Sequence, residues 1–328
     1  MILLIIVVII VITYFLGPSP PNPTYDNRFP ELIRDLNELQ VKLSQEENQK
    51  PIRKDNQARI LCYNDSVQKT EFSIVYLHGF TGSYRDGFPL NVNIAKHIGA
   101  NIFLNRMVGH GLKPPHNLVD FSPENAWHNA KEALAIGQAL GDKVIIMSTS
   151  TGGTLATKLA AKFPDKVYAL INISPNFKDN QFGAFLLNTN WGYEIAKLVS
   201  FGSHKKINHE EPLARKYWDT VYTSEALVDL QVLVQSTMKP PTFNKVRCPV
   251  LTLYYQDNEF EEDTHVEVDI YPEIHDQFRT PEEFKSLVRL ETPRTHFLGS
   301  DIKSEDIESV EKEILSFLNQ KLSIPLKD

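Results

Sequence analysis

Apolar runs typical of buried strands alternate with stretches of helical spacing along most of the chain. Such alternation implies right-handed crossovers between parallel strands, with helices on both faces of the sheet. The pattern therefore predicts an α/β fold with a mainly parallel sheet. Strands are expected at 58–63, 71–77, 101–104, 143–147, 167–173, 249–255 and 286–291, and helices at 90–98, 123–140, 155–163 and 305–322.

The most abrupt change of pattern lies where the run 143–147 ends in the small residues Ser148-Thr-Ser150-Thr-Gly152. A helical stretch follows at once, so the segment is predicted to be strand, tight turn and helix. A serine at the apex of such a corner stands clear of the sheet, where a substrate and a base can both reach its oxygen. Ser150 is therefore the candidate nucleophile, and the alternative is a turn serine without chemistry.

A serine nucleophile needs a base within hydrogen-bond reach, and the base needs a group that fixes its tautomer. Histidine suits this task because its unperturbed pKa lies near neutrality. Of the ten histidines, only His296 lies in a loop between the last predicted strand and the closing helix. His204 and His209 fall in an irregular segment, and His275 falls in a helical stretch. His296 is therefore the predicted base.

Residues 175–247 break the alternation and are rich in aromatic side chains. We interpret them as a helical lid inserted between two strands. Most of these aromatic residues are expected to pack the lid helices onto the core. The alternative is that some of them line an apolar pocket above Ser150.

Residues 2–16 are almost wholly apolar and are followed by the proline-rich cluster 17–23. No small-x-small cleavage site follows Leu16, so a retained N-terminal membrane anchor is favoured over a removed signal peptide that implies export, and over a buried core element. The side of the membrane is left open. Helical spacing at 31–48 predicts an amphipathic connector.

These patterns divide the chain into four parts. Residues 1–23 form the anchor and linker, 24–57 the helical connector, 58–322 the α/β domain with its lid at about 175–247, and 323–328 a tail.

Composition excludes one class of partner. The net charge is −7 and no basic block is present, which argues against binding of nucleic acid. The two cysteines, Cys62 and Cys248, fall near well-separated predicted strands, so no disulfide is expected between them.

The order of Ser150, an acid after a later strand, and His296 resembles that of the α/β-hydrolase fold, and His78-Gly79-Phe80 resembles its His-Gly loop. The chain is similar to the monoacylglycerol lipase and serine aminopeptidase-like (lysophospholipase-like) branch of that superfamily, over about 58–322. It departs from the family at the elbow, where G-x-S-x-G is replaced by S-x-S-x-G.

The resemblance implies a Ser-His-Asp triad, for which the loop after the strand 249–255 offers several carboxylates. Asp263 has the D-x-x-V continuation of the family's catalytic aspartate, whereas Asp257 lies nearer the strand end. Asp263 is the predicted acid and Asp257 the alternative. A calcium loop beginning at Asp257 fails on its pattern, because Glu262 stands where glycine is needed and Val268 where glutamate is needed.

The resemblance also implies an oxyanion hole made by the backbone N–H groups of Phe80 and Thr151. His110 lies in a Gly-His-Gly turn like that of the family, where it is expected to have a structural role or, alternatively, to touch the substrate. The supporting loop residues are His78, Gly79, Gly152 and His110.

The sequence thus predicts a membrane-anchored serine hydrolase that cleaves carboxylic esters through an acyl-enzyme, with lipid-like esters such as monoacylglycerols favoured. No metal or organic cofactor is expected. One alternative is a serine peptidase of the aminopeptidase type, in which Glu210 and Glu211 would meet a free amino terminus. The other is a catalytically silent membrane-anchored binding protein on the same fold.

Overall fold

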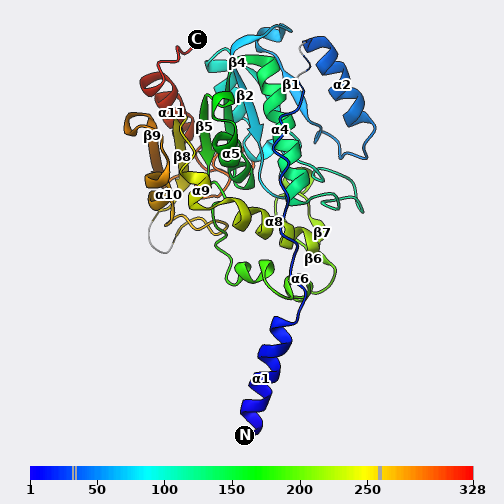
Figure 1. Ribbon diagram of the computed structural model, residues 1–328. Helices are drawn as coiled ribbons and strands as arrows, with labels where there is room; N and C mark the ends of the chain where they lie inside the picture. Colours follow the sequence, from blue (N-terminus) through cyan, green and yellow to red (C-terminus); the bar gives the residue numbers. More distant parts are fainter. Residues whose placement is uncertain (32, 34, 258–260, 328) are drawn as a thin grey trace.

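The computed structural model describes residues 1–31, 33, 35–257 and 261–327, and its centre is a sheet of seven strands (Figure 1). The strand order is β1-β3-β2-β4-β5-β8-β9. β1 runs antiparallel to β3, and every other neighbouring pair is parallel, so the predicted fold class is confirmed. The strands are Arg59–Leu61 (β1), Thr70–Leu77 (β2), Asn101–Leu104 (β3), Gly141–Thr149 (β4), Ala169–Ile173 (β5), Val250–Tyr255 (β8) and Lys285–Leu290 (β9).

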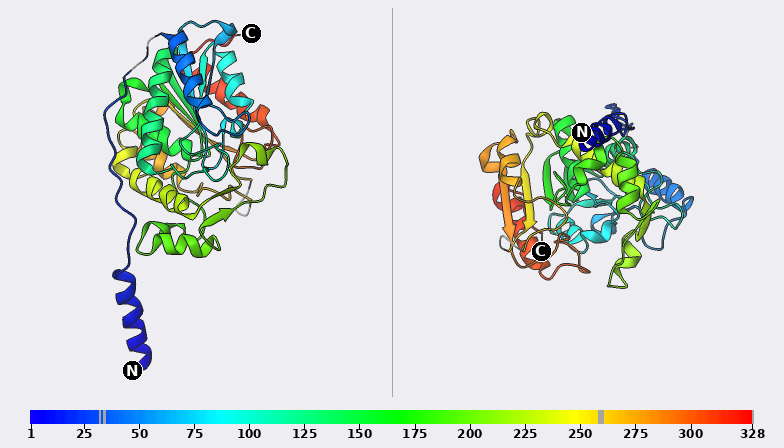
Figure 2. Two further views of the ribbon diagram at one scale, coloured as in Figure 1. Left: turned by 90° about the vertical axis from the view of Figure 1, so that its right-hand side faces the viewer. Right: turned by 90° about the horizontal axis from the view of Figure 1, so that it is seen from below.

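Helices cover both faces of this sheet (Figure 2). The alternation of side chains along β2 shows how the two faces divide, because successive residues of a strand point to opposite sides. Val75 and Leu77 belong to the core shared with α4 and α5, whereas Ile74 and Tyr76 belong to the core shared with α3 and α11. These helices are α3 (Leu90–His97), α4 (Pro123–Leu140), α5 (Thr151–Lys162) and α11 (Ile307–Ser316), with α10 (Tyr271–Gln277) between β8 and β9. Short helical turns lie at Tyr63–Asp65, Tyr84–Asp86, Pro164–Lys166, Glu282–Phe284 and Phe317–Lys321.

The chain between β5 and β8 forms an insert, which we define as residues 175–247. It covers the end of the sheet at which the parallel strands finish (Figure 1). Two contacts fix it there: the Asp219 N–H donates to the carbonyl of Thr81 at 2.7 Å, and the Tyr222 ring packs edge-on against Phe80. The lid function predicted for this insert stays a prediction. Its elements are the turn Ala184–Asn188, α6 (Gly192–Val199), β6 (His204–Lys206), α7 (Ala214–Tyr217), β7 (Val221–Thr223), α8 (Ser224–Thr237) and α9 (Pro240–Phe243).

The apolar N-terminal run forms a helix, α1 (Ile2–Phe15), that projects from the body of the protein beside the insert (Figure 1). Its 14 residues rise by about 21 Å, whereas the hydrocarbon core of a bilayer is about 30 Å thick. No helix in the described part of the chain is both long and apolar enough to cross a membrane. The predicted membrane anchor, and the localisation that was inferred from it, are therefore wrong.

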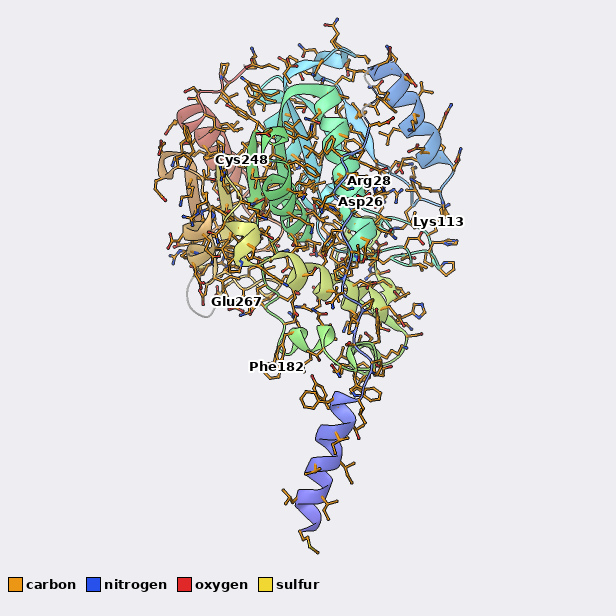
Figure 3. The ribbon with its side chains drawn as sticks, viewed as in Figure 1. Asp26, Arg28, Lys113, Phe182, Cys248 and Glu267 are labelled. Atoms are coloured by element: carbon orange, nitrogen blue, oxygen red, sulfur yellow. The ribbon has the colours of Figure 1, made fainter. Side chains whose placement is uncertain are left out.

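After α1 an extended segment runs along α4, where Figure 3 labels Asp26 and Arg28. The Trp127 indole N–H donates to the carbonyl of Asp26 at 2.8 Å, and Lys131 Nζ donates to that of Arg28 at 2.8 Å. The amphipathic connector is the shorter helix α2 (Leu36–Asn48). Of the spacing on which it was predicted, Leu32 lies outside the described residues.

Helix α2 is tied to the sheet by a buried ion pair. Arg106, in the loop after β3, donates to both carboxylate oxygens of Glu47 at 2.7 Å, and the Ala58 N–H donates to the same group at 2.8 Å. Arg106 also donates to the carbonyl of His110. The connector is thereby joined to the loop in which the predicted Gly-His-Gly turn lies.

Candidate active site

Ser150 occupies the corner between β4 and α5 with φ 54° and ψ −119°, a backbone conformation that costs energy for any residue other than glycine. The corner is held by hydrogen bonds. The Ser150 N–H donates to the carbonyl of Ile173, and the Ser150 carbonyl accepts from the N–H groups of Gly153 and Asn176, both at 2.8 Å. At Gly152 a Cβ would lie 1.9 Å from the Leu77 carbonyl oxygen, so only glycine lets the helix approach the sheet this closely.

The departure from the family pattern at Ser148 is accommodated locally. This side chain is fully buried, yet its hydroxyl donates to the amide oxygen of Asn172 on the neighbouring strand β5 at 2.9 Å. A satisfied buried hydroxyl costs little, and the residue is still small. Serine can therefore replace the family glycine without loosening the turn.

Asp263 and His296 are brought together in a buried hydrogen bond. His296 Nδ1 lies 2.5 Å from Asp263 Oδ2, and the other carboxylate oxygen accepts the backbone N–H groups of His265 at 2.8 Å and Val266 at 3.3 Å. Burial opposes ionisation of this carboxylate, but the charge and hydrogen bond of His296 and the backbone donors outweigh it, so the pKa of Asp263 is lowered. Asp263 is thus held as an anion behind the imidazole.

Asp257 lies elsewhere in the same loop. Its carboxylate is 3.9 Å from the Arg294 guanidinium, and its backbone N–H donates to the carbonyl of Glu261. Among the described residues, Asp257 makes no hydrogen bond to His296. The geometry therefore favours Asp263 over Asp257 as the partner of the histidine.

Ser150 and His296 both follow strands that end at the edge covered by the insert. Within the described part of the chain, no hydrogen bond joins the Ser150 hydroxyl to His296. The bond between nucleophile and base is often long in a serine hydrolase that holds no substrate. Only 9% of the Ser150 surface is exposed, so the residue is almost completely buried at this edge.

The loop His78-Gly79-Phe80 lies directly against the corner, because a Cβ on Gly79 would lie 3.0 Å from the Ser150 Cβ. Thr151 is the first residue of α5, so its N–H has no acceptor inside the helix. In the described residues, neither this N–H nor that of Phe80 is used in a hydrogen bond. Two free donors at one corner are what an oxyanion requires.

The side chains of His78 and His110 are used to hold this loop. His78 Nε2 accepts the N–H of Met107 at 2.9 Å, and its Nδ1 lies 2.8 Å from the Gly79 carbonyl, so the proton is assigned to Nδ1. Burial lowers the pKa of His78 to about 4, which keeps it neutral. The buried His110 ring packs edge-on against both His78 and Phe80. These contacts favour the structural alternative for His110 over substrate contact.

Three other histidines and the two glutamates Glu210 and Glu211 lie away from the Asp263–His296 pair. His275 is buried in α10 and paired with the Thr252 hydroxyl at 2.8 Å. His209 lies in the insert next to Trp218. The Glu211 carboxylate is taken by Lys303 at 2.6 Å, and Glu210 is exposed. His204 is exposed on β6. Among the described residues, none of these side chains forms a hydrogen bond, an ion pair or a ring contact with Asp263 or His296.

A buried carboxylate that sequence reasoning missed lies behind the loop. Asp86 accepts the Gly79 N–H at 2.7 Å through one oxygen and the Tyr76 hydroxyl through the other. Tyr76 is bonded in turn to the hydroxyl of Thr149, the residue before Ser150, at 2.8 Å. Asp86 thus connects both sides of the candidate oxyanion hole. It is fully buried, and burial raises its pKa to about 7. No motif in the sequence signals it.

His265 was also missed. Its ring stacks on that of His296, with centroids 4.6 Å apart and planes at 21°. One ligand atom from each of Asp263, His265 and His296 lies within 4.8 Å of the others. Parallel imidazoles direct their lone pairs side by side rather than toward one ion, and His296 Nδ1 is already bonded to Asp263. The cluster is therefore better suited to hold His296 than to bind a metal.

Two cavities lie next to the insert and the connector, and neither is lined by Ser150, Asp263 or His296. One of about 580 Å³ lies between the start of the insert and α8 to α10, and Phe177, Asp179 and Phe243 line it. The other, of about 630 Å³, lies between α2 and α4 and holds none of the predicted catalytic residues. Only the first is close to the site, because Asp179 pairs with the backbone of Val266 in the loop of Asp263.

Replacement of Asp86 by asparagine is expected to change how stability depends on pH. The folded pKa of about 7 lies above the ordinary value of 3.8, so the native state holds a proton that the unfolded state releases, and stability falls as pH rises from about 4 to 7. Asp86→Asn removes this loss. The variant's free energy of unfolding, relative to that of wild type, should be about 2 kcal/mol higher at pH 8 than at pH 5, measured by urea unfolding. Asp165→Asn, at an exposed acid, is the control, and an equal gain at both pH values would contradict the assignment.

Comparison with known proteins supplies independent support for the fold. A family model described as alpha/beta hydrolase fold matches residues 73–254. No curated protein sequence matches the chain significantly. Similar solved structures include one from work on LipS and LipT, two metagenome-derived lipolytic enzymes, with 17% identity over 82% of this chain and 99% of that chain and a TM-score of 0.66.

Two further similar structures are lipases. The Paleococcus ferrophilus monoacylglycerol lipase shares 15% identity over 80% of this chain and 98% of its own, with a TM-score of 0.57. A soluble variant of the Saccharomyces cerevisiae monoglyceride lipase shares 14% identity over 82% and 90%, with a TM-score of 0.56. At these identities the likeness concerns the fold. Because the family model spans more than half of the sequence, the chain belongs to the α/β-hydrolase fold family.

Proposed function

We propose that the protein is a serine hydrolase that cleaves carboxylic esters through an acyl-enzyme. The observation that carries this proposal is the buried Asp263–His296 hydrogen bond at the sheet edge where Ser150 occupies a strained corner. Activation of a serine hydroxyl needs a base with a fixed tautomer at the same sheet edge, and Asp263 fixes the tautomer of His296 there. The free N–H groups of Phe80 and Thr151 add the donors for an oxyanion.

In the proposed reaction the Ser150 oxygen attacks the ester carbonyl while His296 Nε2 takes the hydroxyl proton. The tetrahedral oxyanion accepts hydrogen bonds from Phe80 and Thr151, each worth about 3 kcal/mol in the transition state. His296 returns its proton to the departing alkoxide, which leaves as the alcohol. A water molecule then gives its proton to His296 and attacks the acyl group, and the acid leaves as Ser150 recovers its hydrogen. Asp263 stabilises the imidazolium in both steps.

Lipid-like esters are the proposed substrates. The aromatic insert and the apolar cavity beside the site suit an acyl chain. Two of the similar structures, a monoacylglycerol lipase and a monoglyceride lipase, support the same substrate class. The peptidase alternative is weakened, because Glu211, one of the carboxylates offered for an amino terminus, is paired with Lys303. A silent binding protein would have no need of the Asp263–His296 pair.

Substitution of the nucleophile tests the reaction. Ser150→Ala should lower ester hydrolysis by at least about 10³-fold on short-chain and long-chain esters alike, because the residual rate comes from binding and the oxyanion donors alone. Initial rates on a chain-length series measure this. Ser148→Ala, two residues before Ser150 on β4, is the matched control and should keep most of the activity. Ester hydrolysis by Ser150→Ala at a rate near that of wild type would contradict the proposal.

The choice between the two acids is tested by a pair of variants. Asp263→Asn should lower kcat by about 10³- to 10⁴-fold, since His296 loses both its orientation and its counter-charge. Asp257→Asn should change kcat less than about threefold, because the ion pair of Asp257 within the described residues is a surface pair with Arg294. The two kcat values are compared at one pH on one ester. The opposite ranking would assign the acid to Asp257.

A further inference from the structure

A second pair of polar side chains lies beside the proposed catalytic residues. Asn176 follows β5, and its backbone N–H donates to the Ser150 carbonyl at 2.8 Å. Three residues later, Asp179 pairs with the backbone of Val266, while the neighbouring Asn180 amide donates to the carbonyl of Asp263 at 3.0 Å. The segment therefore bridges the nucleophile corner and the loop of the acid.

The side chains of Asn176 and Asp179 have more acceptor oxygens than the donor groups around them satisfy. Asn176 Nδ2 donates to Asp179 Oδ1 at 2.9 Å, which uses one oxygen of the carboxylate. Asn176 Oδ1 and Asp179 Oδ2 are both buried and have no partner among the described residues. Asp179 is also the one carboxylate in the described part of the chain with a buried oxygen left unpaired. A buried acceptor without a donor destabilises the folded protein, and it does so more strongly when the acceptor is charged.

The surroundings show what could satisfy them. Asp179 lines the cavity of about 580 Å³, and most of its other walls are apolar, including Phe177, Val234, Phe243 and Ile274. Phe182 also lines the cavity and is wholly exposed at the tip of the insert. Glu267 lines the same cavity away from that tip (Figure 3). Lys178 pairs with Glu267 at 2.7 Å and not with Asp179. Burial raises the pKa of Asp179, and the hydrogen bond from Asn176 opposes that shift.

We propose that Asn176 and Asp179 form a polar subsite for a positively charged, hydrogen-bond-donating group of the substrate, with the adjoining cavity taking its apolar part. An ammonium group suits this position because its donors fill the two open acceptors and its charge offsets the carboxylate. The substrate class is then an ester that carries an amine as well as an apolar chain. This inference rests on the proposed function, since it places the subsite next to its catalytic residues.

The test uses two sets of esters of one length that end in methyl, hydroxyl or ammonium. One set carries the end group on the acyl side and the other on the alcohol side. In one of the sets, wild type should prefer ammonium to methyl in kcat/KM by about tenfold or more, the size expected for a hydrogen bond to a charged group. Wild type should also prefer hydroxyl to methyl, by a smaller factor. Asp179→Asn should lower the ammonium-to-methyl ratio about tenfold and keep the hydroxyl-to-methyl ratio, whereas Asp179→Leu should lower both ratios.

Asp165→Asn is the control variant, because Asp165 is exposed at the opposite end of β5 and should leave every ratio unchanged. Equal losses on all three esters would mean that Asp179 supports His296 rather than the substrate, and would overturn the subsite. Unchanged ratios would overturn it as well.

A binding experiment separates this inference from the reaction. Octylammonium and octanol are titrated by calorimetry into Ser150→Ala with and without Asp179→Asn. The second change should weaken octylammonium about tenfold and octanol less than twofold. If this holds while wild type hydrolyses no ester, the subsite stands and the proposed reaction fails. If octylammonium binds equally to both proteins, the subsite fails whatever the reaction.

Discussion

The structure depends on one close approach, that of α5 to the end of β2. Gly152 touches the Leu77 carbonyl, and this contact forces the chain to turn at Ser150 with a positive φ. The same carbonyl belongs to the strand that leads into the His-Gly loop. A single packing constraint therefore sets the distance between the serine and the loop that would hold the oxyanion. The free N–H of Thr151 follows from it, because a helix that starts at the corner leaves its first donors unpaired.

Buried carboxylates surround this corner, and each is handled differently. Asp263 is paired with His296 and stays ionised. Asp219, from the insert, is held by Arg53 at 2.8 Å and by Asn117, yet burial still raises its pKa to about 6. Asp86 is bonded to neutral donors, and Asp179 keeps one oxygen unpaired. In a medium of low dielectric, partners decide which group remains charged. The site thus combines one carboxylate that stays ionised, Asp263, with three whose pKa values are raised by burial.

The sequence allowed much of this architecture to be predicted, because apolar periodicity is local. The strand at Asn101–Leu104 and the helix at Pro123–Leu140 have the predicted bounds. The turn at Ser150 was predicted from the run of small residues between β4 and α5. What periodicity could not supply were contacts between distant segments, such as the bond from Asp86 to Gly79 and the stacking of His265 on His296. The apolar run at the N-terminus was misjudged, since its composition suits a bilayer but its helix ends at Phe15.

The proposed reaction depends on Ser150 as the nucleophile whose oxygen carries the acyl group. Covalent trapping of this serine tests that role most directly. Wild type is treated with a fluorophosphonate, digested, and mapped by mass spectrometry of its peptides. We expect one adduct, on Ser150, whose formation slows sharply in His296→Ala because the hydroxyl then lacks its base. No adduct on wild type, or an adduct on a different residue, would contradict it.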